Sequence, residues 1–256
     1  MPKYFDIHSH LNLKDYDLDV EKVIARLKEA DTHTIVIGTD LENSKRALEL
    51  AEKHEGIYAA IGVHPVDDPS RVFEEVELEE LVKHPKVVSI GECGLDFYHA
   101  KKAEDYERQK SLFLAHIHFA VKHDKPLMIH ARSAYEELLE ILEPLKKEYG
   151  DKLRGDVHFF AGDWEVAQRL YAIDFTTSFT GVITYTSDYD EVVKKAPLNM
   201  LMSETDAPFA TPVPYRGKRN EPVYVSEVVK RIAEIRGADL EEVRGALVQN
   251  ALNMIG

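Results

Sequence analysis

Short apolar runs alternate with longer amphipathic stretches along the whole chain. The apolar runs are rich in β-branched residues, which is typical of buried strands. Eight strands are predicted, at 3–8, 33–38, 57–63, 87–92, 126–130, 155–160, 175–180 and 200–205. In 19–30 the apolar residues recur on one helical face, as Val20, Val23, Ile24 and Leu27. Helices are also predicted at 42–54, 74–83, 104–123, 134–149, 163–172, 188–195, 223–236 and 239–254.

This alternation favours an α/β fold built from eight strand–helix units. A closed (β/α)8 barrel, the TIM barrel, fits both the order of the elements and the length of 256 residues. An open, doubly wound sheet is the alternative. No linker, internal repeat or low-complexity segment marks a boundary, so we predict a single domain over 1–256.

Composition and charge limit the kinds of protein that this chain can be. With 44% hydrophobic residues the chain has enough apolar material for a large core. The net charge of −14 argues against a broad basic surface that coats duplex DNA, although bound metal ions can create a local nucleic-acid site. The single cysteine, Cys93, excludes an intrachain disulfide, and the N-terminus resembles no signal peptide. We expect a cytoplasmic protein without a membrane partner, as a monomer or weak oligomer.

The candidate chemistry begins with "FDIHSHL", residues 5–11. Residues i and i+2 of an extended strand point to the same side, so His8 and His10 can bind one ion. A second pair with the same spacing, His116 and His118, lies in a predicted helix, where two positions are about 200° apart. We therefore interpret the second pair as packing or surface residues.

Further candidate ligands follow other predicted strands. In a barrel of this kind the active site lies at the carboxyl ends of the strands. Six such residues are expected there: His8, His10, Glu92, His130, His158 and Asp206. Six nitrogen and oxygen ligands suit two divalent ions that share a carboxylate, and Glu92 is the natural bridge. One division places His8, His10, Glu92 and Asp206 on the first ion, and Glu92, His130 and His158 on the second.

Three nearby residues have other expected roles. Asp6 is either a further ligand or, as we favour, a carboxylate that accepts a hydrogen bond from one of these imidazoles. Cys93 adjoins Glu92 and is expected to be a small buried residue. Tyr98 and His99 follow the fourth predicted strand and face either substrate or solvent.

An ordered set of motifs resembles one protein family. "FDIHSHL", "GVHP", "GECGLDFY", "MIHAR", "VHFFAG", "SETDAPF" and "YRGKRNEPVYV" stand in the order found in TatD-type deoxyribonucleases, and the likeness covers nearly the whole chain. The resemblance implies a TIM-barrel metal-dependent hydrolase of the wider amidohydrolase group. It also implies a Mg²⁺-dependent nuclease that trims DNA from the 3′ end, with the six residues above as ligands. Mn²⁺ and Zn²⁺ suit the same ligand types.

The expected reaction is hydrolysis of a DNA phosphodiester bond by a water that two metal ions activate. Asp206 is the expected acceptor of the water proton, besides being a ligand, and Glu92 completes the catalytic pair. His64 and Arg132 are candidates to hold phosphate oxygens. The proline-rich loop 206–222 carries three basic residues that either guide the nucleic-acid backbone or form salt bridges: Arg216, Lys218 and Arg219.

Other activities are compatible with the same ligands. A D-aminoacyl-tRNA deacylase would direct the activated water at an ester carbonyl, and RNA is a further substrate to consider. A cyclic-amide hydrolase is disfavoured, because many of those enzymes bridge their metals with a lysine where this chain has Glu92. A non-catalytic binding protein would not require a complete set of six ligands.

Overall fold

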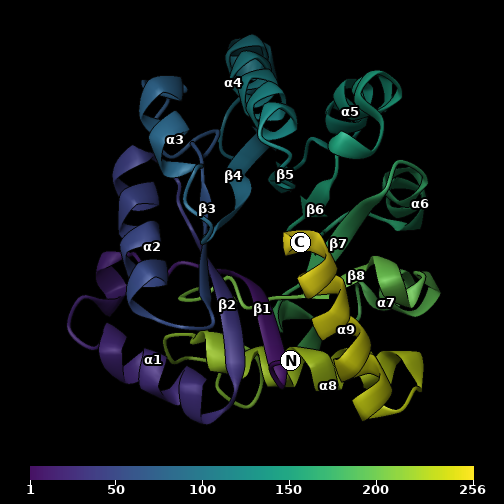
Figure 1. Cartoon of the computed structure of the whole chain (residues 1–256). Coiled ribbons are helices and arrows are strands. Elements are labelled where there is room, and N and C mark those ends of the chain that lie inside the picture. The colour runs from purple at the N-terminus through teal and green to yellow at the C-terminus, as the bar shows by residue number, and fades with distance from the viewer.

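The computed structural model describes all 256 residues, and eight parallel strands form its centre. Each strand pairs with its neighbours in sequence, in the order β1 to β8 (Figure 1). The strands are β1 (Tyr4–Ser9), β2 (Thr32–Ile37), β3 (Ile57–Ile61), β4 (Val87–Asp96), β5 (Leu127–Arg132), β6 (Gly155–Val157), β7 (Phe175–Phe179) and β8 (Leu201–Ser203). The predicted strands are all present, with shifted ends.

The ring closes between β1 and the segment that follows β8. The backbone N–H of Asp206 donates to the carbonyl of His8 at 2.9 Å, and the N–H of His10 donates to the carbonyl of Ala207 at 2.7 Å. Ser9 and Ala207 form a parallel bridge. The fold is therefore a nearly closed (β/α)8 barrel, and the open-sheet alternative is wrong.

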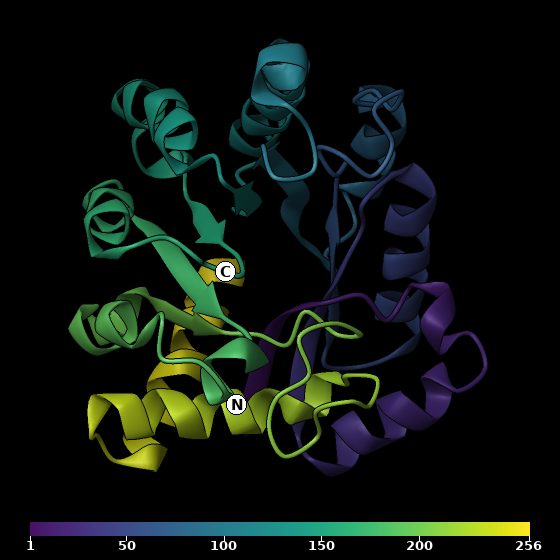
Figure 2. The same ribbon diagram turned by 180° about the vertical axis from the view of Figure 1, so that it is seen from behind.

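Helices surround the strands on the outside (Figures 1 and 2). They are α1 (Val20–Glu29), α2 (Leu41–Lys53), α3 (Glu75–Leu81), α4 (Lys102–Lys122), α5 (Tyr135–Tyr149), α6 (Trp164–Ala172), α7 (Asp190–Lys195), α8 (Val225–Arg236) and α9 (Leu240–Ile255). The face of α1 predicted to be apolar is the buried one, with Val23, Ile24 and Leu27 each at most 2% exposed. No helix has both the length and the apolar content that crossing a membrane requires.

Apolar side chains fill both the space under the helices and the barrel interior. The interior cluster joins residues of widely separated strands, such as Ile7 of β1 and Met128 of β5. Val248, Ala251 and Met254 of α9 belong to the same cluster, so α9 covers the end of the barrel where the strands begin (Figure 1). Residues 206–222 loop over the other end of the barrel (Figure 2).

Two strand ends differ from the predicted ones for structural reasons. β4 continues beyond Glu92 because its register shifts after Ile90, and the residues from Cys93 to Asp96 then pair with β5. Gly94 permits this close pairing, since a Cβ atom there would lie 2.0 Å from the carbonyl oxygen of His130. β6 ends at Val157, and Phe159 turns the chain with a φ of 46°.

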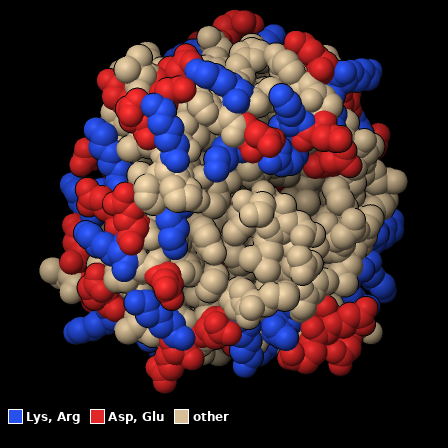
Figure 3. Space-filling view, in the orientation of Figure 1, with Lys and Arg blue, Asp and Glu red and all other residues tan.

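The charged surface agrees with the acidic composition. On the face seen in Figure 3, Lys and Arg are interspersed with Asp and Glu around an uncharged area. That face has no broad basic field of the kind that binds duplex DNA through its phosphates.

Candidate metal centre

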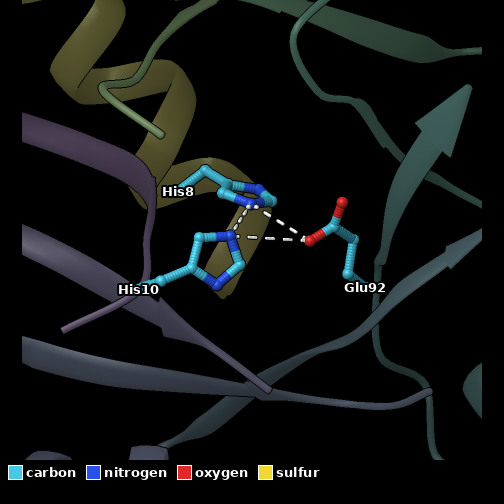
Figure 4. Close-up of side chains that lie close together, drawn as sticks. All are labelled: His8, His10 and Glu92. Atoms are coloured by element: carbon cyan, nitrogen blue, oxygen red, sulfur yellow. Dashed lines mark hydrogen bonds and ion pairs between the residues drawn. The ribbon is translucent and has the colours of Figure 1, made fainter. Parts of the chain in front are cut away.

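The six candidate ligands meet at the carboxyl end of the barrel. They come from five places in the chain: the end of β1, the middle of β4, β5, the turn after β6 and the turn after β8. Figure 4 shows His8 and His10 from the β1 end facing Glu92 of β4. All six side chains are largely buried, although they are polar. Burying polar groups costs free energy unless they are paired with each other or bind a metal ion.

One group of donors surrounds a single point. The Nε2 atoms of His8 and His10 lie 3.2 Å apart, and Oε2 of Glu92 lies 3.4 and 3.7 Å from them, respectively. Oδ1 of Asp206 is 3.7 Å from Nε2 of His8 and 3.4 Å from Nε2 of His10. Four donors placed about 2.0–2.1 Å from one cation in a tetrahedron lie roughly 3.4 Å from each other. The spacing therefore fits a shared divalent cation.

A second group faces the other oxygen of Glu92. Oε1 lies 2.8 Å from Nε2 of His158, 3.1 Å from Nδ1 of His130 and 3.6 Å from Nε2 of His64. His64 points its Nε2 inward because its Nδ1 lies 2.7 Å from Oδ1 of Asp67. His64, expected from the sequence to contact phosphate, thus also lies where a second cation would bind.

Glu92 is the carboxylate common to both groups. Burial alone would raise its pKa, but His158, His64 and His130 outweigh burial and hold the pKa well below the usual value. The same balance lowers the pKa of Asp206, through a hydrogen bond to His10 and the charges of His8 and His10. Both carboxylates are therefore ionised, as metal ligands must be.

Two carboxylates that the sequence reasoning did not single out orient the imidazoles. Oε2 of Glu204 lies 3.8 Å from Nδ1 of His8 and 3.6 Å from Nδ1 of His158, within ion-pair distance of both, and none of these three buried atoms has a hydrogen-bond partner. Each Nε2 is thereby turned toward the donor groups. Glu204 stands two residues before Asp206, and this spacing within the quoted "SETDAP" was the signal available.

Asp96 performs the corresponding role for His130. Its Oδ2 accepts a hydrogen bond from Nε2 of His130 at 3.0 Å and one from Nδ1 of His99 at 2.8 Å. Its Oδ1 accepts the backbone N–H groups of Tyr98 and His99 at 2.9 and 2.8 Å. This arrangement leaves Nδ1 of His130 as the ligand atom. His99 thus lies at the cavity wall, and Tyr98 is exposed beside it.

The role expected for Asp6 is wrong. Its carboxylate contacts no imidazole; Oδ1 accepts backbone N–H groups of His8 and Thr205, and Oδ2 accepts the Thr205 hydroxyl at 2.6 Å. Burial raises the pKa of Asp6 well above the usual value. Asp6 therefore holds β1 against the segment after β8, and it positions the ligands only through the backbone. Cys93 is fully buried, as expected.

The centre lies in a cavity of about 850 Å³, within the range of small-molecule sites. Arg132 is the only lysine or arginine among its lining residues, while Asp67, Glu92, Asp96 and Asp206 give it a strongly acidic wall. The guanidinium of Arg132 lies 4.2 Å from the centre of the exposed Tyr98 ring. Arg132 is thus positioned to meet an anionic group that enters the cavity.

The basic residues of the loop 206–222 lie outside the lining of the cavity. The guanidinium of Arg219 makes a two-pronged ion pair with Asp19, at 2.8 Å for each contact, which is the salt-bridge alternative considered for this loop. Arg216 is exposed and stacks on Tyr185 at 3.7 Å, and Lys218 is also exposed. Arg216 and Lys218 remain available to a substrate, whereas Arg219 holds the loop against the segment before α1.

The second histidine pair lies in α4, away from the centre. His116 is buried, where its Nε2 accepts the N–H of Val63 at 2.9 Å and its Nδ1 donates to the carbonyl of Leu112 at 2.8 Å. His118 contacts the hydroxyl of Tyr149 at the surface. The interpretation of this pair as packing and surface residues is confirmed.

Comparisons with known proteins agree with this geometry. The family model described as TatD related DNase matches residues 5–256. The metal-dependent hydrolase YabD of Bacillus subtilis is 42% identical in an alignment of 251 positions that covers 96% of this chain and 96% of its own. The metal-dependent hydrolase YcfH of Escherichia coli K12 is 31% identical over 96% of this chain and 92% of its own. The crystal structure of YjjV, a TatD homologue from Escherichia coli K12, superposes with a TM-score of 0.88 at 30% identity, covering 99% of this chain and 98% of the other.

Proposed function

The chain belongs to the family of TatD-related DNases and is a metal-dependent hydrolase, and we propose that it hydrolyses phosphodiester bonds of DNA with two divalent cations. The observation that carries the proposal is the position of Glu92. Its Oε2 faces His8 and His10, and its Oε1 faces His130 and His158. Each oxygen of Glu92 could therefore take one of two cations, and paired cations are suited to phosphodiester hydrolysis.

Bound cations would supply an activated water and offset the negative charge of a phosphodiester. The chain contributes positioning and proton transfer. Asp206 lines the cavity and is held ionised by His8 and His10, so its carboxylate can accept the proton of an attacking water. Arg132 offers a two-pronged donor to a phosphate oxygen.

The electrostatics of the cavity explain why such a reaction depends on metal. Four acidic side chains line the cavity together with one arginine and five histidines, and the carboxylates repel a phosphodiester where no cation lies between them. Two divalent cations would reverse this charge. The proposal thus includes metal-dependent binding of substrate as well as metal-dependent chemistry.

The test uses protein stripped of metal and reloaded with Mg²⁺, Mn²⁺ or Zn²⁺. The substrates are single-stranded DNA labelled at either end, the matching duplex, RNA of the same sequence and a D-aminoacyl-tRNA. We expect stepwise shortening of single-stranded DNA from the 3′ end, only with metal, and loss of at least 100-fold in rate in Asp206→Asn. Release of amino acid from the tRNA without any DNA cleavage would overturn the proposal, as would inactivity on DNA with two ions bound.

A further inference from the structure

An aromatic ring stands unusually exposed beside the metal centre. Phe209 lines the cavity and is 54% exposed, three residues after the ligand Asp206. Its ring is edge-on to the ring of His10, with centroids 6.3 Å apart and planes at 67°. Phe159, the neighbour of His158, also lines the cavity but is half-buried. Phe209 is therefore the apolar ring that a bound substrate can cover.

The backbone of Phe209 is held rigidly. Its N–H donates to the carbonyl of Asp206 at 2.8 Å, and its own carbonyl accepts a hydrogen bond from the side chain of Asn220. Asn220 is fully buried, and its backbone N–H donates to the carbonyl of Pro208 at 3.1 Å. These bonds anchor both ends of the loop, so the ring projects from a fixed base.

The surroundings define what the ring can bind. The charged and imidazole side chains of the lining, among them His10 and Asp206, suit cations and a phosphate. In a nucleic acid, the flat apolar group nearest a phosphate is the nucleobase of the same nucleotide. Stacking on an aromatic side chain tolerates every base, because each base has a π face. A base inside a duplex has both faces covered, and a paired terminal base is held in place by its partner, whereas an unpaired terminal base can turn a free face onto Phe209.

We propose that Phe209 stacks on the unpaired base of the terminal nucleotide whose phosphate lies at the metal centre, and that it thereby selects single-stranded ends. This assignment rests on the proposed nuclease function. Phe209 acts by holding the substrate and transfers no proton or electron. Its contribution should therefore appear in KM more than in kcat.

The test compares two single-stranded oligonucleotides with the metal-loaded enzyme. They differ only in the terminal nucleotide at the end that is trimmed, which carries a base in one and is abasic in the other. We expect the wild type to prefer the end with a base about tenfold in kcat/KM, the size of one stacking contact. Phe209→Leu should lose this preference by raising KM for the normal end, with an unchanged rate on the abasic end. Phe209→Tyr should restore the preference.

Val213→Ala is the matched control, since Val213 is an apolar residue of the same loop, 45% exposed, that does not line the cavity. It should behave as the wild type. Equal cleavage of the two ends by the wild type, or a full preference in Phe209→Leu, would overturn the inference and leave the nuclease proposal standing. Cleavage of neither oligonucleotide would overturn both. Metal content and circular dichroism of each variant show whether the fold and the centre are intact.

Discussion

Replacing Asp96 by asparagine tests how the second donor group is organised. All four groups that contact the Asp96 carboxylate are donors: the His130 and His99 rings and the N–H groups of Tyr98 and His99. Hydrogen bonds to these groups outweigh burial and hold the pKa of Asp96 below its usual value, so it is a carboxylate. An amide has one oxygen and two N–H donors, and it cannot accept from both sides.

The expected consequence is a change of tautomer in His130. If the amide oxygen keeps the two backbone N–H groups, the NH₂ group faces Nε2 of His130, which must then accept. The proton moves to Nδ1, the atom that lies 3.1 Å from Oε1 of Glu92. A protonated nitrogen cannot bind a cation. Loss of such an orienting carboxylate costs about 10- to 100-fold in metal affinity, or roughly 1.4 to 2.7 kcal/mol.

The assay is a titration of the metal-free protein with Zn²⁺ or Mn²⁺, followed by calorimetry or by competition with a chromogenic chelator. We expect one of two ions to bind more weakly in Asp96→Asn, while the other binds as in the wild type. His99→Ala is the control, because it removes one exposed donor to Asp96 and leaves His130 paired; its affinities should change less than about threefold. Wild-type affinity for both ions in a folded Asp96→Asn protein would refute the reasoning.

Three further results are expected. Glu92→Gln leaves one amide oxygen where two carboxylate oxygens face separate donor groups. Elemental analysis should therefore find at most one ion per chain, and turnover should fall at least 100-fold. Two retained ions would contradict the role of Glu92 as a bridge. Burial lowers the pKa of His10, His130 and His158, but nearby carboxylates outweigh burial and raise it, so these rings keep their protons to a higher pH than a free imidazole does. Metal affinity should therefore increase from pH 5 to pH 8, and an affinity independent of pH would count against imidazole ligands. Gly94→Ala places a Cβ 2.0 Å from the carbonyl oxygen of His130, at a residue whose φ is 140°. Urea unfolding should show that the free energy of unfolding falls by about 2 kcal/mol or more. Unchanged stability would mean that the β4–β5 pairing can relax around the added methyl group.

Much of the fold was predictable from the sequence because its signal is local. The alternation of apolar runs and amphipathic stretches shows, residue by residue, which side of each element is buried. A chain with eight such strand–helix units can adopt only a few known architectures. The positions of the ligand candidates followed from the same pattern. His8 and His10 share one side of an extended strand end, and the carboxyl ends of parallel strands meet at one mouth.

Other features were decided only by the folded chain. Whether Asp6 meets an imidazole or a backbone N–H depends on the closure of β1 against a segment about 200 residues later. The roles of Glu204 and Asp96 depend on which ring nitrogen each carboxylate faces, and the salt bridge of Arg219 depends on where Asp19 lies. Hydropathy along a chain specifies which side of an element is buried, but not the distances between atoms of distant elements. Those distances arise from the packing of the whole barrel, and they determine which donors face a cation and which hold the donors in place.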